Sequence, residues 1–259
     1  DWTERTLVSH IEMGQYQVSF PCGGKVGTAF NMHPTGKGLN WRTNLYYMQT
    51  DDFGATWKAA DGTLLETPLE ESVNPALAAD FKSKNRNVYM KDVNYDSNGN
   101  PIILVVTSGG YESGPKNDPR TWTTARWTGA EWEIREGFTS DNNYDTGPLY
   151  VESDRTWRVI APTQTGPQPY NPGGEIAMWL TEDAGETWKM VRQMTIDSPF
   201  NHTYVRRPVN ADPDFYGLWA DGHGRQESKS RLYYCNRDGE VFMLPETMDG
   251  PFARARKIR

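Results

Sequence analysis

The sequence predicts an all-β fold made of repeated antiparallel units, and two observations carry this prediction. First, the chain contains one eight-residue segment twice, as TDDFGATW at 50–57 and TEDAGETW at 181–188. Second, its 259 residues include 24 Gly, 17 Pro, 13 Tyr and 10 Trp, which suits many short strands joined by tight turns. A chain of this length can bury a full core as one large all-β domain or as two smaller ones.

The repeated segment has the pattern of a tight hairpin. We expect Asp52 and Asp183 to accept hydrogen bonds from backbone N–H groups of their own turns, and Gly54 and Gly185 to supply a positive φ. The Thr that follows opens the next strand, and the closing Trp packs a large apolar surface into the layer beneath. The pattern Ser/Thr-x-Asp-x-Gly-x-Thr-Trp is the Asp-box motif of sialidases and other BNR-repeat propellers. It predicts structure rather than catalysis.

Four units of similar layout follow one another along the chain. Each contains two apolar strands joined by a turn, then a variable loop and an aromatic-rich closing hairpin. A repeat of four strands over roughly 40 to 70 residues is typical of a β-propeller blade. The blades are predicted at about 12–62, 86–137, 145–193 and 203–246 of a single propeller domain covering 1–259.

Two further expectations concern the parts outside these strands. Helix content is predicted to be low, because only the segment 70–81 could form a turn or two and Pro75 limits it. The segment Trp2 to His10 is interpreted as the outer strand of a preceding blade. Because Asp-box propellers usually have five to seven blades, we expect N-terminal blades outside this sequence, and the family resemblance described below implies seven blades in all.

The net charge and the hydropathy of the chain argue against two classes of partner. The net charge of −7 argues against a nucleic-acid partner, while a local positive site could still hold an anionic sugar. No apolar run approaches the roughly 20 residues that span a bilayer, so no membrane partner is expected. The first residues do not look like a signal peptide, which is uninformative for a processed chain. Cys22 and Cys235 leave a disulfide, two thiols or metal ligation open.

Titratable residues at strand ends are the candidates for chemistry. His10 precedes the first complete blade, and His33 follows an apolar strand in a loop that also holds Lys37 and Arg42. Tyr111 follows the comparable strand of the second blade, and Arg126 lies on the next strand. Such a set suits β-elimination of a uronate polymer. A cation neutralises the C6 carboxylate, one side chain removes the C5 proton, and another protonates the leaving oxygen.

The chain resembles BNR-4-type propellers, in particular the seven-bladed ulvan lyases that act on rhamnose–glucuronate linkages. The resemblance rests on the Asp-boxes, the blade pattern and the segment NHTYVRRPVNADPDFYGLWADG at 201–222. It implies that Tyr111 and one histidine, His10 or His33, share the base and acid roles. Arg126 and the other histidine would hold the uronate carboxylate.

The resemblance also implies the surroundings of the reaction. The partner would be an anionic polysaccharide or oligosaccharide, and the protein a monomer, secreted or periplasmic, that needs no cofactor for catalysis. The further substrate-binding residues predicted are Lys37, Arg42, His202 and Arg206.

A second polar cluster leaves a metal site open. His202 and His223 flank the first hairpin of the fourth blade, and Cys235 lies on its next strand, so these three could hold a structural Zn²⁺. A structural Ca²⁺ is the other possibility, and plain hydrogen bonding or substrate contact are the alternatives to a metal.

Other functions fit the same scaffold. A glycoside hydrolase, such as an α-L-rhamnosidase or a sialidase-like enzyme, would use paired carboxylates, for which Asp92 and Asp145 are the best candidates. A non-catalytic carbohydrate-binding propeller is the third hypothesis, because the fold alone does not choose among them.

Overall fold

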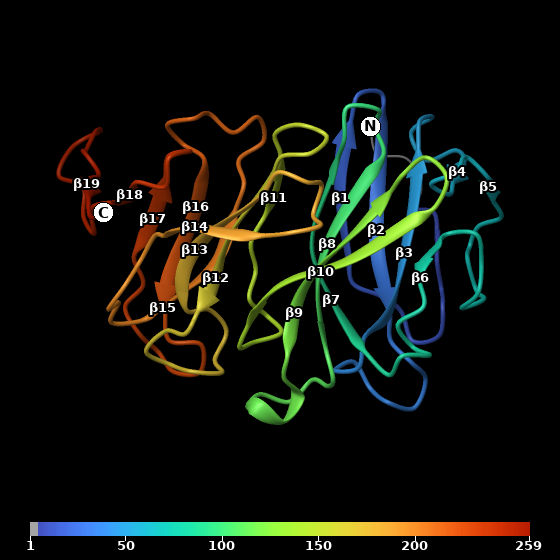
Figure 1. The fold of residues 1–259 in the computed structure, drawn as a ribbon, viewed down its shortest axis with the longest axis horizontal. Helices are drawn as coiled ribbons and strands as arrows, with labels where there is room; N and C mark the ends of the chain where they lie inside the picture. The colour runs from blue at the N-terminus through green and yellow to red at the C-terminus, as the bar shows by residue number, and fades with distance from the viewer. Residues whose placement is uncertain (1–4) are drawn as a thin grey trace. The chain divides into compact units, whose positions relative to one another are not determined.

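The computed structural model describes residues 5–259, and strands dominate it (Figure 1). Four antiparallel sheets follow one another along the chain, which confirms the all-β prediction. The chain divides into two compact units. Unit 1 comprises the chain up to Tyr111 together with Thr123–Glu136, and unit 2 comprises Glu112–Trp122 together with Gly137–Arg259. The prediction of one propeller domain over the whole chain stays a prediction.

The first two sheets are meanders. Sheet 1 has the order β1 (Gln17–Cys22), β2 (Lys25–Met32), β3 (Thr43–Thr50), β4 (Trp57–Lys58) and β5 (Leu64–Leu65), with β6 (Leu77–Ala79) paired to β3. Sheet 2 has the order β10 (Trp132–Ser140), β9 (Arg120–Trp127), β8 (Pro101–Ser108) and β7 (Asn87–Tyr95).

The last two sheets repeat this plan. Sheet 3 has the order β11 (Leu149–Val151), β12 (Trp157–Gln164), β13 (Glu175–Thr181) and β14 (Lys189–Gln193). Sheet 4 has the order β15 (Asn201–Arg206), β16 (Gly217–Gly222), β17 (Leu232–Cys235), β18 (Val241–Met243) and β19 (Arg256–Lys257). Each sheet therefore carries the four-strand repeat that the sequence predicts.

The two repeated segments form matching turns between β3 and β4 and between β13 and β14. Asp52 Oδ1 accepts from the Thr56 N–H at 2.9 Å, and Asp183 Oδ1 accepts from the Thr187 N–H at 2.8 Å. The turn glycines have φ of 88° and 86°. The hydrogen-bonded aspartate and the positive-φ glycine expected from the sequence are thus confirmed in both copies.

Two local expectations differ from the structure. The segment 70–81 contains no helix; it holds bends and strand β6, because Pro75 lacks the N–H that a helix would use. The helix described in residues 5–259 is one 3₁₀ turn, η1 (Pro115–Asn117). Strand β15 ends at Arg206, ahead of Pro208, whereas the sequence pattern of the fourth blade predicts a first strand from Tyr204 to Asn210.

The proposed outer strand from Trp2 to His10 lies partly outside the described residues, which begin at residue 5. Within the described part, Ser9 forms a single parallel bridge to Leu69 and no longer strand.

The core of unit 1 lies between sheets 1 and 2. Ala29, Leu45 and Tyr47 on one face of sheet 1 pack against Val88 and Val105 of sheet 2, all of them buried. The other face of sheet 1 is covered by its own flanking segments in a second cluster, which includes Ile11, Phe30, Met32, Tyr46 and Leu69. Because both faces are buried, β3 has no exposed residue, which explains the apolar and aromatic run Leu45–Met48 at its centre.

The core of unit 2 lies between sheets 3 and 4. Ile160 and Ile176 of sheet 3 pack against Val205, Trp219 and Tyr233 of sheet 4. Burial of side chains of this size stabilises each by about 2 kcal/mol, so the face-to-face packing of sheets dominates the stability of the unit.

Gly147 in unit 2 is fixed by close packing. A Cβ at this position would lie 2.3 Å from the Ile160 carbonyl oxygen and 2.5 Å from the Ala161 Cβ. We therefore expect Gly147→Ala to destabilise the protein by about 2–4 kcal/mol, because backbone must shift. The urea midpoint measures this. Gly250→Ala is the control, because a Cβ there meets nothing within 4 Å and should change the midpoint little. Equal midpoints for the two variants would contradict the packing described.

One end of unit 1 gathers its long loops. Strands β2 and β8 end there, and strands β3 and β7 begin there. We call residues 33–42, 82–87 and 109–111 the loop end of unit 1. The turn 50–57 lies at the opposite end of sheet 1, since β3 runs the full height of the sheet between them.

Candidate functional site

His33 occupies the centre of the loop end. It directly follows β2, its N–H donates to the Gly14 carbonyl at 2.9 Å, and its ring is buried. Its Nδ1 lies 2.9 Å from the carbonyl oxygen of Trp41. Because a carbonyl only accepts, the proton of the neutral ring must be on Nδ1. The lone pair of the neutral ring is therefore on Nε2, as a general base requires.

The surroundings of His33 keep the ring uncharged. Burial lowers the pKa of His33 below its usual 6.5, the Trp41 carbonyl partly opposes this, and the positive charge of Arg42 lowers it further. The ring is consequently in its proton-accepting form at neutral pH.

Arg42 lies between two tyrosine rings. Its guanidinium carbon is 4.3 Å from the ring centroid of Tyr16 and 4.9 Å from that of Tyr89. The Tyr16 ring also meets the His33 ring edge-on, with centroids 5.0 Å apart. A planar guanidinium that is stacked in this way is fixed in orientation, and its N–H groups suit a carboxylate.

An aromatic platform adjoins this cluster. The rings of Trp41 and Tyr111 meet edge-on with centroids 6.1 Å apart, and Lys37 Nζ lies 4.6 Å from the Trp41 ring. Tyr111 is 39% exposed. Next to the platform, a pocket of about 50 Å³ contains Lys37, Lys82 and Arg86. The loop end thus combines aromatic surface with several cations.

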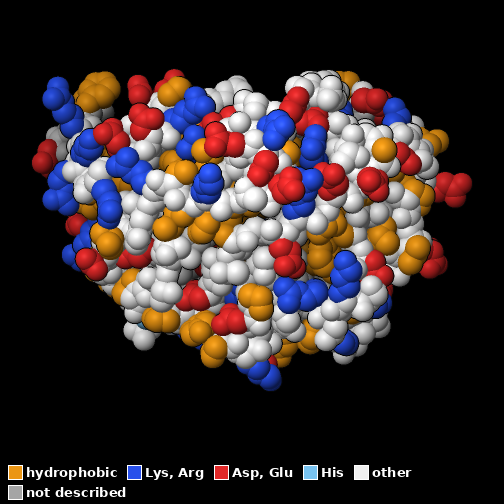
Figure 2. Space-filling model, viewed as in Figure 1, with side chains coloured by type: hydrophobic (Ala, Val, Ile, Leu, Met, Phe, Trp, Pro, Cys, Tyr) orange, Lys and Arg blue, Asp and Glu red, His pale blue; other side chains and the backbone are white. Residues whose placement is uncertain are grey.

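The positive character of this site is local. The chain has 27 Lys and Arg against 34 Asp and Glu, and Figure 2 shows both kinds interspersed over the face drawn. The charge at a given site therefore depends on its immediate neighbours rather than on the net charge.

The structure brings His33, Lys37, Arg42 and Tyr111 to the loop end, and it does not bring Arg126 there. Arg126 lies at the far end of β9, where its Nη2 is 3.9 Å from Asp96 Oδ2. Asp96 directly follows β7, roughly 30 Å along that strand from Asn87 at the loop end. The pairing of Arg126 with His33 and Tyr111 is therefore corrected, and Arg42 is the arginine beside His33.

His10 lies on the flank of sheet 1. It is exposed, and its backbone N–H donates to the Leu69 carbonyl at 2.7 Å. Two residues later, Glu12 forms a bridge with His33. The structure thus places His10 two residues before Glu12, whose backbone bridges to His33. His10 itself lies on an exposed segment outside the Tyr16–Arg42–Tyr89 stack.

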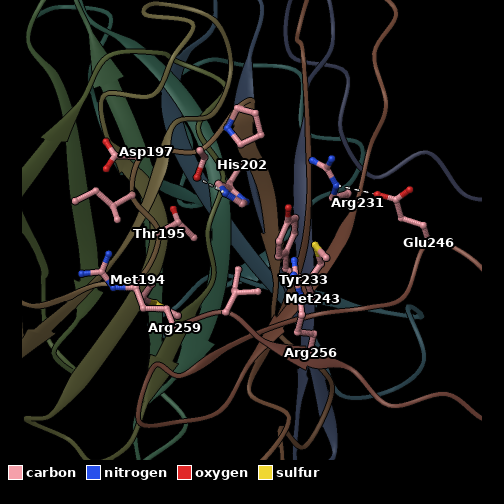
Figure 3. Close-up of a pocket in the computed structure, with 14 residues that line it drawn as sticks. Met194, Thr195, Asp197, His202, Arg231, Tyr233, Met243, Glu246, Arg256 and Arg259 are labelled. Atoms are coloured by element: carbon pink, nitrogen blue, oxygen red, sulfur yellow. Dashed lines mark hydrogen bonds and ion pairs between the residues drawn. The ribbon is translucent and has the colours of Figure 1, made fainter.

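His202 belongs to a buried chain of hydrogen bonds in unit 2. Figure 3 shows its ring in a pocket that Tyr233 and Met194 also line, with one of these hydrogen bonds as a dashed line. Trp219 Nε1 donates to its Nδ1 at 2.9 Å, so the ring proton is on Nε2, which lies 2.9 Å from Ser198 Oγ. The Ser198 hydroxyl in turn donates to Glu175 Oε2 at 2.8 Å. In this order the histidine donates to the serine, so the arrangement is not that of an activated nucleophile. We assign it a structural role.

His202 makes unit 2 sensitive to acid. Burial lowers its pKa to about 4, opposed by the charges of Glu175 and Asp221. The unfolded chain, with a His pKa near 6.5, binds more protons between these values, so stability is full above about pH 6.5 and falls toward pH 4. We expect a loss of up to about 3 kcal/mol, measured by urea unfolding at pH 7 and pH 4.5.

The control for this prediction is His202→Gln, which cannot titrate. Its stability should fall less between the two pH values than that of the wild type. The same pH dependence in both proteins would remove His202 as the cause.

The structure does not assemble the metal site proposed at His202, His223 and Cys235. Both ring nitrogens of His202 are engaged as described above, and His223 Nδ1 accepts from the Arg225 N–H at 3.1 Å. Burial raises the pKa of the Cys235 thiol to about 12, so the thiol is protonated at neutral pH. Within residues 5–259, no group of three His, Cys, Asp or Glu side chains is arranged to hold a metal.

Arg206 does not join a site with His202. It lies at the other end of β15, is exposed, and its guanidinium carbon is 5.7 Å from the Tyr204 ring centroid. Cys22 and Cys235 are both free thiols.

The residues that sequence reasoning missed are aromatic. Tyr16, Trp41 and Tyr89 hold Arg42, His33 and Tyr111 in place. The adjacent Trp41 and Arg42, immediately before a strand, are a signal that could have indicated Trp41, while Tyr16 and Tyr89 come from distant segments and have no such signal.

Comparison with known proteins agrees with this architecture. Residues 12–140 match the model of a family described as "BNR repeat-containing family member". This match confirms the resemblance to BNR-repeat propellers. No curated protein sequence matches the chain.

Among solved structures, the chain is similar to a polysaccharide lyase described as PL25 ulvan lyase. The TM-score is 0.67 at 18% identity, over 86% of this chain and 51% of that chain. The same lyase bound to -[GlcA(1-4)Rha3S]- gives the same values. A Hadza microbial sialidase is similar at a TM-score of 0.46 and 14% identity, over 85% of this chain and 42% of that one.

The likeness to the lyase structures shows the fold, which is that of a β-propeller. The chain spans about half the length of those structures. The seven-blade expectation stays a prediction. Among the described residues, no helix is long and apolar enough to cross a membrane.

Proposed function

We propose that the protein is a carbohydrate-active enzyme, and specifically a lyase that cleaves a uronate-containing polysaccharide by β-elimination at the loop end of unit 1. The observation that carries the proposal is the pairing of a neutral His33 with the stacked Arg42 around the shared ring of Tyr16. A fixed cation beside a neutral base is what proton removal next to a carboxylate requires.

The side chains have distinct roles in this proposal. Arg42 binds the C6 carboxylate and stabilises the charge that develops as the C5 proton leaves. His33 Nε2 accepts that proton. The C4–O4 bond then breaks, a C4=C5 double bond forms, and the exposed hydroxyl of Tyr111 protonates the leaving oxygen. The Trp41–Tyr111 platform offers a sugar ring an apolar face, with Lys37 nearby for a further anionic group.

One comparison and one feature of the structure support the choice of substrate class and reaction. The solved structures with the same fold include a lyase that was described in complex with -[GlcA(1-4)Rha3S]-, a glucuronate-containing glycan. A glycoside hydrolase is less well supported, because Asp145 is held by the backbone N–H groups of Asn142 and Gly173 at 3.1 and 2.7 Å. Both oxygens of this buried carboxylate already accept hydrogen bonds from the backbone.

A carbohydrate-binding propeller without catalysis is the second candidate. It is favoured by the burial of His33, which is 2% exposed, so that a substrate reaches Nε2 only after a local rearrangement. In that case the cations and the aromatic platform would bind the glycan without cleaving it.

Absorbance at about 235 nm separates these functions, since β-elimination alone creates an unsaturated uronate. The protein is incubated with ulvan and with other uronate polymers, and reducing ends are measured in parallel. A rise in absorbance with any polymer supports the lyase. New reducing ends without absorbance contradict it in favour of a hydrolase, and retained glycan binding without either signal contradicts it in favour of the binding protein.

A further inference from the structure

The small pocket beside the aromatic platform is lined mainly by basic and polar side chains. It lies entirely in unit 1, has a volume of about 50 Å³, and contains three basic side chains together with Trp41 and Asn87. The remaining lining residues are Pro34, Thr43 and Asn85. At 10–15 Å³ for each water, the pocket holds about four waters, so a substituent of a sugar fits and a whole ring does not.

Asn87 supplies the second observation. Its side chain is fully buried, and its Oδ1 has no hydrogen-bond partner among residues 5–259. Its Nδ2 donates to Tyr89 Oη at 3.4 Å, and Tyr89 Oη donates to the Asn40 carbonyl at 3.4 Å, which orients the amide. A buried acceptor without a donor costs about 1–3 kcal/mol, so a ligand that brings a donor gains that amount.

The second feature of the pocket is its three basic side chains, Lys37, Lys82 and Arg86. Lys82 Nζ forms an ion pair with Glu12 at 2.7 Å, and Arg86 Nη2 donates to Thr107 Oγ1 at 3.1 Å. Lys37 lies over the Trp41 ring. One carboxylate therefore faces three positive charges, and the pocket has a surplus of positive charge that favours an anion.

From the surplus of positive charge and the unpaired Asn87 Oδ1, we infer that the pocket binds an anionic substituent that has a hydroxyl group on the neighbouring atom. The cations hold the anion, and Asn87 Oδ1 accepts the hydroxyl proton. The inference rests on the proposed function in one respect, since it assigns a second anion-binding subsite of the same glycan, separate from the carboxylate at Arg42. A bare anion leaves Asn87 Oδ1 unpaired, so the hydroxyl is what gives the pocket specificity.

The test compares glycolate with acetate, which differ by this one hydroxyl and are small enough for the pocket. Binding to the whole chain is measured by NMR titration at constant ionic strength. We expect glycolate to bind about tenfold more tightly than acetate, the effect of satisfying one buried acceptor. Equal binding of the two anions, or binding of neither, would overturn the inference.

Substitutions in the pocket lining test whether glycolate binds there. Lys82→Gln and Arg86→Gln should weaken glycolate binding about fivefold each, because each removes a charge that faces the anion. Lys84→Gln is the matched control, since Lys84 is a nearby lysine outside the lining. Asn87→Leu should make glycolate and acetate bind equally. Unchanged glycolate binding in both Lys82→Gln and Arg86→Gln would contradict the assignment.

Failure of the subsite can be distinguished from failure of the proposed lyase function. His33→Asn removes the proposed base and lies outside the pocket lining, so it should bind glycolate like the wild type even if it cleaves no polymer. If the wild type raises the absorbance at about 235 nm but binds glycolate and acetate equally, the subsite is disproved and the lyase proposal stands.

Discussion

His33→Asn is expected to lower kcat on a uronate polymer by about 10²- to 10⁴-fold, the contribution of a positioned general base. The Asn amide N–H can replace Nδ1–H and keep the hydrogen bond to the Trp41 carbonyl, which is 2.9 Å long in the wild type. The change removes Nε2 and little else. Thermal stability should therefore stay close to that of the wild type while turnover is lost.

The pH profile gives an independent check on His33. Its pKa lies below 6.5 because of burial and the charge of Arg42, so the wild-type rate should fall on the acid side as the ring becomes protonated, at a pH below 6.5. If the rate of His33→Asn lies within tenfold of the wild type, His33 is not the base. His33→Ala is the comparison for structure, since it also loses the hydrogen bond and should unfold at a lower temperature.

Arg42→Met is expected to lower kcat/KM by about 10²- to 10³-fold, because the group that stabilises the developing charge is lost. Arg42→Lys should recover only part of this. A lysine keeps the charge but cannot stack as a plane between Tyr16 and Tyr89, 4.3 and 4.9 Å from the guanidinium carbon. Steady-state kinetics on one polymer at a fixed salt concentration measure both variants.

The matched control is Arg135→Met, which removes an arginine of unit 1 that pairs with Glu133 at 3.3 Å. It should have kinetics like those of the wild type. Full activity in Arg42→Lys would show that charge alone is needed and that the stacked geometry has no role. Equal losses in Arg42→Met and Arg135→Met would point to a general effect of net charge.

Much of the fold follows from local patterns in the sequence. The TDDFGATW and TEDAGETW turns are set by an aspartate that bonds to its own turn and by a glycine at positive φ, so they could be predicted without knowing the rest. The structure places β15 at Asn201–Arg206, earlier than the strand predicted from Tyr204 to Asn210, and Pro208 cannot continue the pairing. Burial on both faces also hides the strand period in β3.

The candidate site could be predicted only in part. His33, Lys37 and Arg42 share one loop, so their proximity follows from the sequence. Arg126 could have been excluded, because consecutive strands run in opposite directions and a residue at the end of β9 lies far from the loop that precedes it. Placing Arg42 between Tyr16 and Tyr89 needs the tertiary packing of three segments, for which no local pattern exists.

The sequence left a metal site at His202, His223 and Cys235 open for a similar reason. The spacing of His202 and Cys235 fixes which strands they lie on but not where their side-chain atoms point. In the structure, Trp219 and Ser198 use both ring nitrogens of His202. Sequence alone cannot show that two neighbours have already satisfied a histidine.

Hydrogen–deuterium exchange of the whole chain with and without a saturating glucuronate-containing oligosaccharide tests the central claim most directly. The His33→Asn variant is used so that the ligand is not consumed. The account predicts slower exchange at 33–42, 82–87 and 109–111, the loop end of unit 1, and unchanged exchange at 194–203 around His202. Protection confined to 194–203, with none at the loop end, would contradict it.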